Sequence, residues 1–387
     1  MHRHLPTAGM AAALVVAATL GCSNETPPRA SQDSSVSALR SGTAAPPTLT
    51  PQVSGTNNGL IAVSPVTSRV AWVSGRAGTY AVTTNGGATW RAGVVPGAEA
   101  LQFRDVEGVS DKVAYLLSIG TGTDSRIYKT VNGGATWSLQ FTNQDPAGFY
   151  DCFAFWTSKR GILFGDSVNG RFPVRRTTDG RTWIDIGNKL PPALPGEGGF
   201  ASSGTCAATQ GEERAWIATG AGERARILAT RDGGDSWAAH DTPLRGSPSA
   251  GIFSVEFRDG SHGIIGGGDL DPTAPPFENV ARSGDGGRTW RATARAPMGT
   301  VFGLAYARER GDDDEEDDHS SRDGQSRPNV VVTGPAGAAW SANEGDTWQS
   351  LEGVSGFWAV AFANERTGWL VGTGGRILQI SFPIGSP

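Results

Sequence analysis

The sequence predicts an all-β chain folded as a seven-bladed β-propeller, and three observations lead to that prediction. A turn motif that ends in tryptophan occurs six times, with 46 to 58 residues between successive tryptophans. Self-similarity at a period of about 20–50 residues is the signature of a repeat architecture. Glycine is abundant, at 55 of 387 residues, and charged residues are only 18%. Short alternating runs bounded by Gly, Asn and Asp suggest a sandwich, barrel or propeller, and the period and count favour the propeller.

The clearest copy of the motif reads SGDGGRTW, from Ser283 to Trp290. The other copies end at Trp90, Trp137, Trp183, Trp237 and Trp348. The third position is always Asx, namely Asn85, Asn132, Asp179, Asp232, Asp285 and Asn343. Such side chains accept hydrogen bonds from backbone N–H groups two residues on, the glycines allow positive φ, and tryptophan offers a large apolar face to a neighbouring sheet. We therefore interpret each copy as a structural turn between strands three and four of a blade.

The chain opens with the pattern of an export signal over residues 1–21. His2, Arg3 and His4 precede an apolar run from Ala8 to Leu20, which ends at Gly21 and Cys22. A charged, an apolar and a small-residue part in this order is typical of a secretory signal peptide, and thirteen residues are too few to span a bilayer. The ending resembles the lipobox of bacterial lipoproteins, which implies lipidation of Cys22; simple secretion is the alternative.

Residues 22–47 are rich in Ser, Thr, Pro and Ala and lack aromatic residues. Such a segment cannot bury enough apolar surface to fold, so we expect a disordered tether that holds a domain off a membrane. The propeller is expected over 48–383, with an acidic loop inserted at 309–327. That insertion, GDDDEEDDHSSRDG in part, is interpreted as a solvated loop because like charges in a block repel.

Blades can be written out from the alternating runs. In the fifth blade, strands are expected at 252–257, 263–268 and 279–283, and the motif then turns into the fourth strand. The third blade is expected to use 153–156, 161–165 and 174–178, and the last blade 358–362, 368–372 and 376–380. The last blade lacks a fourth strand, and an exposed edge strand is an aggregation hazard. We expect Leu49 to Val53 to fill that edge and close the ring.

The repeated SxDGGxTW turns resemble the BNR or Asp-box repeats of sialidases, within the broader set of YVTN and WD40-like propellers. The whole arrangement looks more like the seven-bladed photosystem II assembly and stability factor family. That resemblance covers nearly all of the chain after the tether and implies a propeller that binds a protein. Asp boxes occur in enzymes and binding proteins alike. The arginine motif of sialidases is echoed only by Arg171 to Pro173, which lies in the third blade and not in the first.

A ligand site is expected on the face opposite the motif turns, built from the loops between strands two and three and from the links between blades. Candidate catalytic groups for a central funnel on that face are Tyr150, Asp151, Asp166, Arg171, Glu197, Asp269 and Asp271, and Arg224 is a further polar candidate. Ordinary loop charges are the other interpretation. Two of these carboxylates would serve a hydrolase only at a separation of about 5–9.5 Å.

Cysteine usage fits an exported protein. With Cys22 lipidated, Cys152 and Cys206 remain at equivalent positions of neighbouring blades. An oxidising compartment permits a disulfide between them, and spacing alone leaves its formation open. No metal site is predicted, because none of the five histidines forms a ligand-spaced pair with these cysteines.

Composition also narrows the partners. The formal net charge is −5. The sequence has no basic stripe interleaved with aromatic residues, which is the pattern that would indicate nucleic-acid binding. No phosphate-binding GxxxxGK[ST] loop is present, and no cofactor is predicted. We expect a monomer in the bacterial cell envelope, anchored by lipid alone, that binds an extracytoplasmic protein or glycan as a scaffold. A sialidase-like glycoside hydrolase is the alternative, and an extracytoplasmic oxidoreductase is the second.

Overall fold

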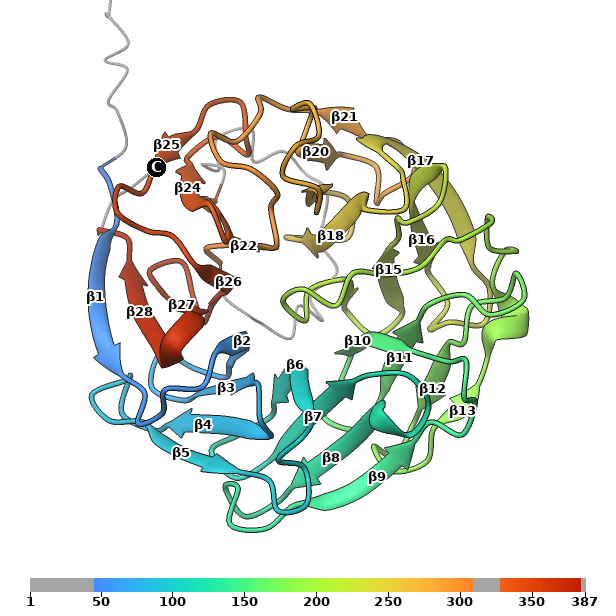
Figure 1. Ribbon diagram of the computed structural model, residues 1–387. Coiled ribbons are helices and arrows are strands. Elements are labelled where there is room, and N and C mark those ends of the chain that lie inside the picture. Colours follow the sequence, from blue (N-terminus) through green and yellow to red (C-terminus); the bar gives the residue numbers. More distant parts are fainter. Residues whose placement is uncertain (1–44, 309–327, 384–387) are drawn as a thin grey trace, which may run out of the picture. The chain divides into compact units, whose positions relative to one another are not determined.

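A computed structural model describes residues 45–308 and 328–383, and these residues form seven four-stranded antiparallel sheets arranged as blades around a central axis (Figure 1). The predicted seven-bladed propeller is therefore confirmed. The signal sequence, the tether, Cys22 and the acidic run lie outside the described residues. Within the described residues, no helix is long and apolar enough to cross a membrane.

Each blade runs from an innermost to an outermost strand. Blade 1 contains β2 (Leu60–Pro65), β3 (Ala71–Gly75), β4 (Thr79–Thr83) and β5 (Arg91–Val94). Blade 2 contains β6 (Gln102–Gly108), β7 (Ala114–Ile119), β8 (Arg126–Thr130) and β9 (Ser138–Thr142). Blade 3 contains β10 (Tyr150–Phe155), β11 (Gly161–Gly165), β12 (Arg175–Thr177) and β13 (Ile184–Asp185). Blade 4 contains β14 (Ala207–Gln210), β15 (Arg214–Ala218), β16 (Arg224–Thr230) and β17 (Ala238–Arg245).

The remaining blades follow the same order. Blade 5 contains β18 (Ala250–Phe257), β19 (Gly263–Asp269), β20 (Val280–Ser283) and β21 (Arg291–Ala292). Blade 6 contains β22 (Gly303–Tyr306), β23 (Val330–Gly334), β24 (Gly337–Ser341) and β25 (Gln349–Ser350). Blade 7 contains β26 (Phe357–Phe362), β27 (Thr367–Gly372), β28 (Arg376–Ser381) and β1 (Thr48–Val53). Three single-turn 3-10 helices lie in loops, at Gly122–Asp124, Gly187–Lys189 and Thr373–Gly375.

The ring closes through β1, as the sequence predicts. This strand pairs antiparallel with β28, in a register that places Thr48 opposite Ser381 and Val53 opposite Arg376. The N-terminal strand therefore supplies the missing outer strand of blade 7. Gln52 connects this strand to blade 1, because its Nε2 donates to the Gly86 carbonyl at 3.1 Å.

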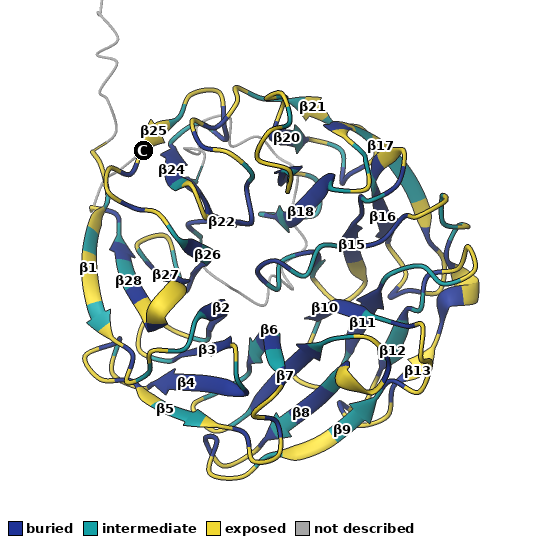
Figure 2. Ribbon diagram, viewed as in Figure 1, coloured by how far each residue is buried: buried dark blue, intermediate teal, exposed yellow. Residues whose placement is uncertain are grey.

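Burial falls from the axis outward (Figure 2). All residues of the inner strands β2 and β10 are buried, whereas every residue of the outer strands β13 and β25 is exposed. Inner and middle strands are covered by neighbouring blades on both faces, so they consist of nearly continuous apolar runs. Outer strands meet solvent and are accordingly polar.

Five of the six motif turns use one set of hydrogen bonds. In the fifth blade, Ser283 Oγ accepts the Gly287 N–H at 2.9 Å, and Asp285 Oδ1 accepts the Thr289 N–H at 2.9 Å. The Asx bond therefore reaches four residues on in this copy, and not two as expected. In the shorter third-blade copy the Asx bonds span fewer residues, because Asp179 Oδ1 accepts the N–H groups of Arg181 and Thr182, two and three residues on.

Each motif tryptophan packs against the blade that precedes its own. Trp90 joins the apolar cluster of blades 7 and 1, and Trp183 joins that of blades 2 and 3. The glycine of the motif turn also bonds the turn between the first two strands of its own blade; for example, the Gly286 N–H donates to the Ser261 carbonyl at 2.7 Å. Both kinds of turn therefore share one face of the propeller, which is called the motif face below.

Candidate functional site

The inner strands of five blades carry a β-bulge at the same place, near the end away from the motif face. The register shifts by one residue in β2, β6, β10, β18 and β26. The five extra residues, called the bulge residues below, are Ile61, Arg104, Asp151, Phe253 and Trp358. A bulge re-aims a side chain out of the regular alternation, and bulges are common beside active sites.

Contacts between side chains of different blades show where bulge residues point. The Arg104 guanidinium of blade 2 lies 5.3 Å from the centre of the Trp358 ring of blade 7. The Phe302 ring, which immediately precedes β22, lies 5.2 Å from Trp358 and 5.5 Å from Phe253. These side chains therefore meet across the end of the central channel that faces away from the motif turns.

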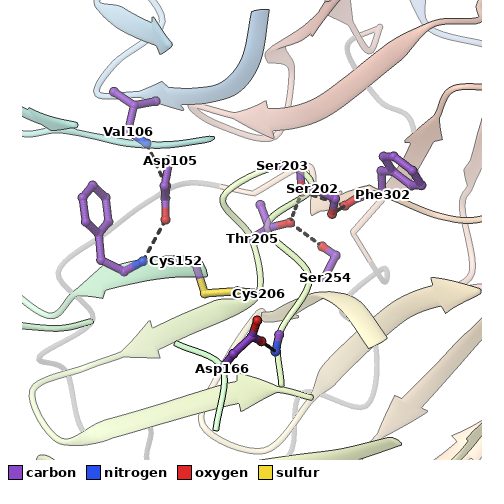
Figure 3. Close-up of a disulfide and its surroundings, with 12 residues drawn as sticks. Asp105, Val106, Cys152, Asp166, Ser202, Ser203, Thr205, Cys206, Ser254 and Phe302 are labelled. Atoms are coloured by element: carbon purple, nitrogen blue, oxygen red, sulfur yellow. Dashed lines mark hydrogen bonds between the residues drawn. A yellow bond between two sulfur atoms is a disulfide. The ribbon is translucent and has the colours of Figure 1, made fainter. Parts of the chain in front are cut away.

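A segment that links blades 3 and 4 crosses this end of the channel. Residues 199–205, called the central segment below, precede β14, and in Figure 1 the yellow-green chain of this region reaches the centre of the ring beside β15. The Arg104 Nη1 donates to the Ala201 carbonyl at 3.0 Å. Ser203 Oγ donates to the Phe302 carbonyl at 2.6 Å (Figure 3). The segment is thus held by blades 2 and 6 as well as by its own neighbours.

A disulfide anchors the end of the central segment. Cys206 immediately precedes β14 and is bonded to Cys152 of β10, with a Cα separation of 6.0 Å (Figure 3). Both half-cystines are buried. The bond ties blade 3 to blade 4 directly beside the channel.

Beyond the central segment the channel contains a cavity of about 360 Å³ that extends towards the motif face. Ser203, Gly204 and Thr205 line one end of it. Its charged lining residues are Asp105, Glu107, Glu212, Glu256 and Arg308. Two of them connect blades: Asp105 Oδ2 accepts the Phe153 N–H at 2.8 Å, and Glu256 Oε2 accepts the Tyr306 N–H at 2.8 Å.

Two of the sequence-predicted carboxyls come together. Asp151 and Asp166 are in hydrogen-bond contact, and Asp166 Oδ1 also accepts the Gly199 N–H at 2.9 Å. Burial raises the pKa of Asp151 well above its usual range, and the charge of Asp166 raises that pKa further. Asp151 Oδ2 faces no donor among the described residues. A protonated Asp151 that donates to Asp166 satisfies that oxygen and removes the repulsion between like charges.

This pair does not have the geometry of a glycosidase. Hydrogen-bonded carboxyls are closer than the about 5–9.5 Å that an acid and its partner carboxylate need on either side of a sugar. Asp151 is also only 1% exposed. The pair instead holds the start of the central segment against blade 3.

The other funnel candidates do not converge. Tyr150 is buried, and its Oη accepts Arg175 Nε at 2.7 Å. Glu197 is buried in an ion pair with Arg226 and accepts the Thr219 hydroxyl at 2.6 Å. Both side chains therefore serve packing, because a buried polar group needs partners of this kind.

The remaining candidates form ion pairs with outer strands or bonds within a local turn. Arg171 forms an ion pair with Asp185 of the outer strand β13, and Arg224 forms one with Asp241 of the outer strand β17. Asp269 accepts the N–H of Asp271 at 3.0 Å in a local turn. Of the eight candidates, Asp151 and Asp166 come together beside the central segment, whereas Tyr150, Glu197, Arg171 and Arg224 have other partners in the fold. A ligand site built from these residues stays a prediction.

A sequence signal for the bulges does exist. The residue before each bulge pairs with a residue 15 positions later, which is glycine in four of the five blades, namely Gly75, Gly165, Gly267 and Gly372. A Cβ on Gly165 would lie 2.1 Å from the Phe149 carbonyl oxygen, so only glycine allows that close approach. An apolar residue followed 15 positions later by glycine would have marked the channel end.

No protein-family model matches the sequence, and no curated protein matches it. Among solved structures, YCF48 bound to a D1 peptide is 16% identical with a TM-score of 0.57, over 88% of this chain and 98% of that chain. The chain shares the propeller fold of YCF48. YCF48 from Cyanidioschyzon merolae is 14% identical with a TM-score of 0.55, over 86% of this chain and 98% of that chain. The GH74 enzyme of Niastella koreensis is 14% identical with a TM-score of 0.52, over 86% of this chain and 44% of that chain.

Proposed function

We propose that this protein is a protein-binding scaffold that acts on an extracytoplasmic partner, in the manner of an assembly factor. One observation carries the proposal over catalysis: the carboxyls that a hydrolase would use are engaged within the fold. Asp151 and Asp166 hold each other, and Glu197 is neutralised by Arg226. The likeness to YCF48, seen there with a D1 peptide, supports the same direction.

The binding face is proposed to be the one opposite the motif turns. The half-exposed Trp358 lies there beside the guanidiniums of both Arg76 and Arg104, which are 5.8 Å and 5.3 Å from the ring centre. Tryptophan and arginine are the residues most enriched at the energetic centres of protein interfaces. The motif turns on the other face are proposed to be Asp boxes with a structural role only.

The anchor is part of the same proposal. Export through residues 1–21, lipidation of Cys22 and a tether over 22–47 would place the propeller at the surface of a membrane in the bacterial envelope. We expect Cys22→Ser to move the protein from the membrane fraction to the soluble fraction. Membrane association of Cys22→Ser that survives an alkaline carbonate wash would contradict the lipid anchor.

Site-specific photo-crosslinking in living cells tests the binding face. A photoreactive amino acid is placed at Asn57, an exposed residue of the link before β2, and the matched control carries it at Arg288, an exposed residue of a motif turn. We expect one discrete protein adduct from position 57 and none from position 288. Adducts from neither position, or equal adducts from both, would overturn the proposed binding face.

A further inference from the structure

Two arginines share one tryptophan ring at the channel end. The Arg76 guanidinium lies 5.8 Å from the centre of the Trp358 ring, and the Arg104 guanidinium lies 5.3 Å from it. Arg76 directly follows β3 and is exposed, and its main-chain N–H is fixed by the Gly59 carbonyl at 2.9 Å. Arg104 is a bulge residue and is half-buried. The chain therefore brings two positive charges from two blades to one spot.

Neither guanidinium has a carboxylate partner among the described residues. Arg104 donates to the Ala201 carbonyl at 3.0 Å and to Gln102 Oε1 at 3.2 Å, which leaves its buried Nε without a hydrogen-bond partner in the same part of the chain. Burial lowers the pKa of Arg104 to about 10, and the charge of Arg76 contributes to that shift. The residues that the structure describes thus keep two like charges together without a counter-charge.

The surroundings strengthen any interaction made there. Phe302 covers one edge of Trp358, and Phe253 lies behind Phe302. Both phenylalanines are buried, so one side of the site is apolar. Charge-assisted hydrogen bonds gain strength where water is excluded.

We propose that Arg76, Arg104 and Trp358 form a binding site for a carboxylate group. The planar fork of a guanidinium matches a carboxylate with two parallel hydrogen bonds, and a single negative charge needs less desolvation than a phosphate dianion beside an aromatic ring. The carboxylate belongs either to an acidic residue of the protein partner or to a free small acid. Only the first source rests on the proposed function.

The indole N–H resonance of Trp358 in the ¹⁵N-labelled protein reports occupancy directly, and the variant Trp358→Phe assigns it. Three probes are titrated: acetate, a capped peptide with one aspartate, and inorganic phosphate. The same peptide with asparagine in place of aspartate is its control. We expect the aspartate peptide, or the peptide and acetate together, to shift the resonance in a saturable way, and 0.5 M salt to weaken the effect because exposed charges are screened.

Three variants test the assignment. Arg76→Gln and Arg104→Gln should each weaken binding about tenfold or more, as expected for loss of a charged hydrogen-bond donor. Arg288→Gln, which removes an exposed arginine of the motif face, should bind as the parent does. Because Arg104 also holds the central segment, the binding result for Arg104→Gln counts only if the melting temperature of this variant matches that of the parent. If it does not, Arg76→Gln, at an exposed position, provides the test.

Each outcome has a definite meaning. Binding of the aspartate peptide without acetate assigns the site to a partner protein, and equal binding of acetate assigns it to a free acid. No shift with either carboxylate probe, tighter binding of phosphate, or unchanged affinity in Arg76→Gln would overturn the proposal. A crosslinked partner whose yield does not fall in Arg76→Gln would leave the scaffold function standing and exclude the partner protein as the source of the carboxylate. Carboxylate binding without any partner adduct would leave the carboxylate site standing and contradict the scaffold function.

Discussion

One glutamine of the closing strand bonds both blades beside the closure, and its contribution to stability can be measured. Gln52 of β1 accepts two indole N–H groups on its Oε1, from Trp90 at 2.9 Å and from Trp369 at 3.1 Å. Trp90 belongs to blade 1 and Trp369 to blade 7, so one side chain joins the two blades on either side of the closure. Both rings are buried.

The substitution Gln52→Leu keeps the size of the side chain and removes its polar atoms. Each buried donor left without a partner costs about 1–3 kcal/mol. The Gly86 carbonyl loses one donor but keeps Gln379 Nε2 at 3.2 Å, so it adds little. Because both bonds are only partly buried, we expect a loss of about 2–4 kcal/mol in the free energy of unfolding.

Urea unfolding followed by tryptophan fluorescence measures this loss, and an unchanged m-value would show that the unfolded surface is the same. Gln379→Leu is the matched control, because it removes one bond to the Gly86 carbonyl and leaves Gln52 in place; its expected loss is below about 1 kcal/mol. Equal losses in the two variants, or a loss below about 0.5 kcal/mol in Gln52→Leu, would refute the assignment of ring closure to Gln52.

Two further predictions concern carboxyl groups. Asp285→Ala should lose about 1–3 kcal/mol in the free energy of unfolding, because Asp285 accepts hydrogen bonds from Ser283, Arg288 and Thr289. Asp285→Asn should be as stable as the parent, since other copies of the turn carry Asn. Equal melting temperatures of all three proteins would count against this role. Burial raises the pKa of Asp285, but the hydrogen bonds from Thr289 and Ser283 outweigh it and lower that pKa to about 2. The parent should therefore lose this stabilisation as the pH falls from about 4 towards 2, while Asp285→Asn does not. Asp151→Asn should raise the urea midpoint at pH 7. The pKa of Asp151 in the folded protein lies well above the value of about 3.9 in an unfolded chain. The stability that protonated Asp151 contributes is therefore complete below about pH 4 and is lost as the pH rises. A midpoint below the parent at pH 7, or a gain that persists at pH 3.5, would contradict that reasoning.

The fold could be predicted because each repeat contains a turn whose residues are required by local hydrogen bonds and backbone conformation. The turn needs a hydroxyl, an Asx and glycines at fixed offsets, and these residues recur whatever the blade packs against. Strand ends were less certain: β10 begins at Tyr150 and not at Phe153, since the bulge at Asp151 interrupts the alternation by which strands are recognised. The closing strand was predictable because an incomplete blade needs an edge partner.

The site could not be predicted in the same way, because its residues share a position and not a chemistry. Ile61, Arg104, Asp151, Phe253 and Trp358 are five different residue types, so no motif unites them. What unites them is the partner strand: a Cβ on Gly372 would lie 2.3 Å from the Gly356 carbonyl oxygen, and the glycine lets the inner strand take an extra residue. The glycines therefore permit the bulges, whereas the side chains at the bulges differ from blade to blade. Among the described residues, the bulge residue beside Trp358 is Arg104, which has no carboxylate partner, and this charge is the reason why we propose the channel end as the recognition site.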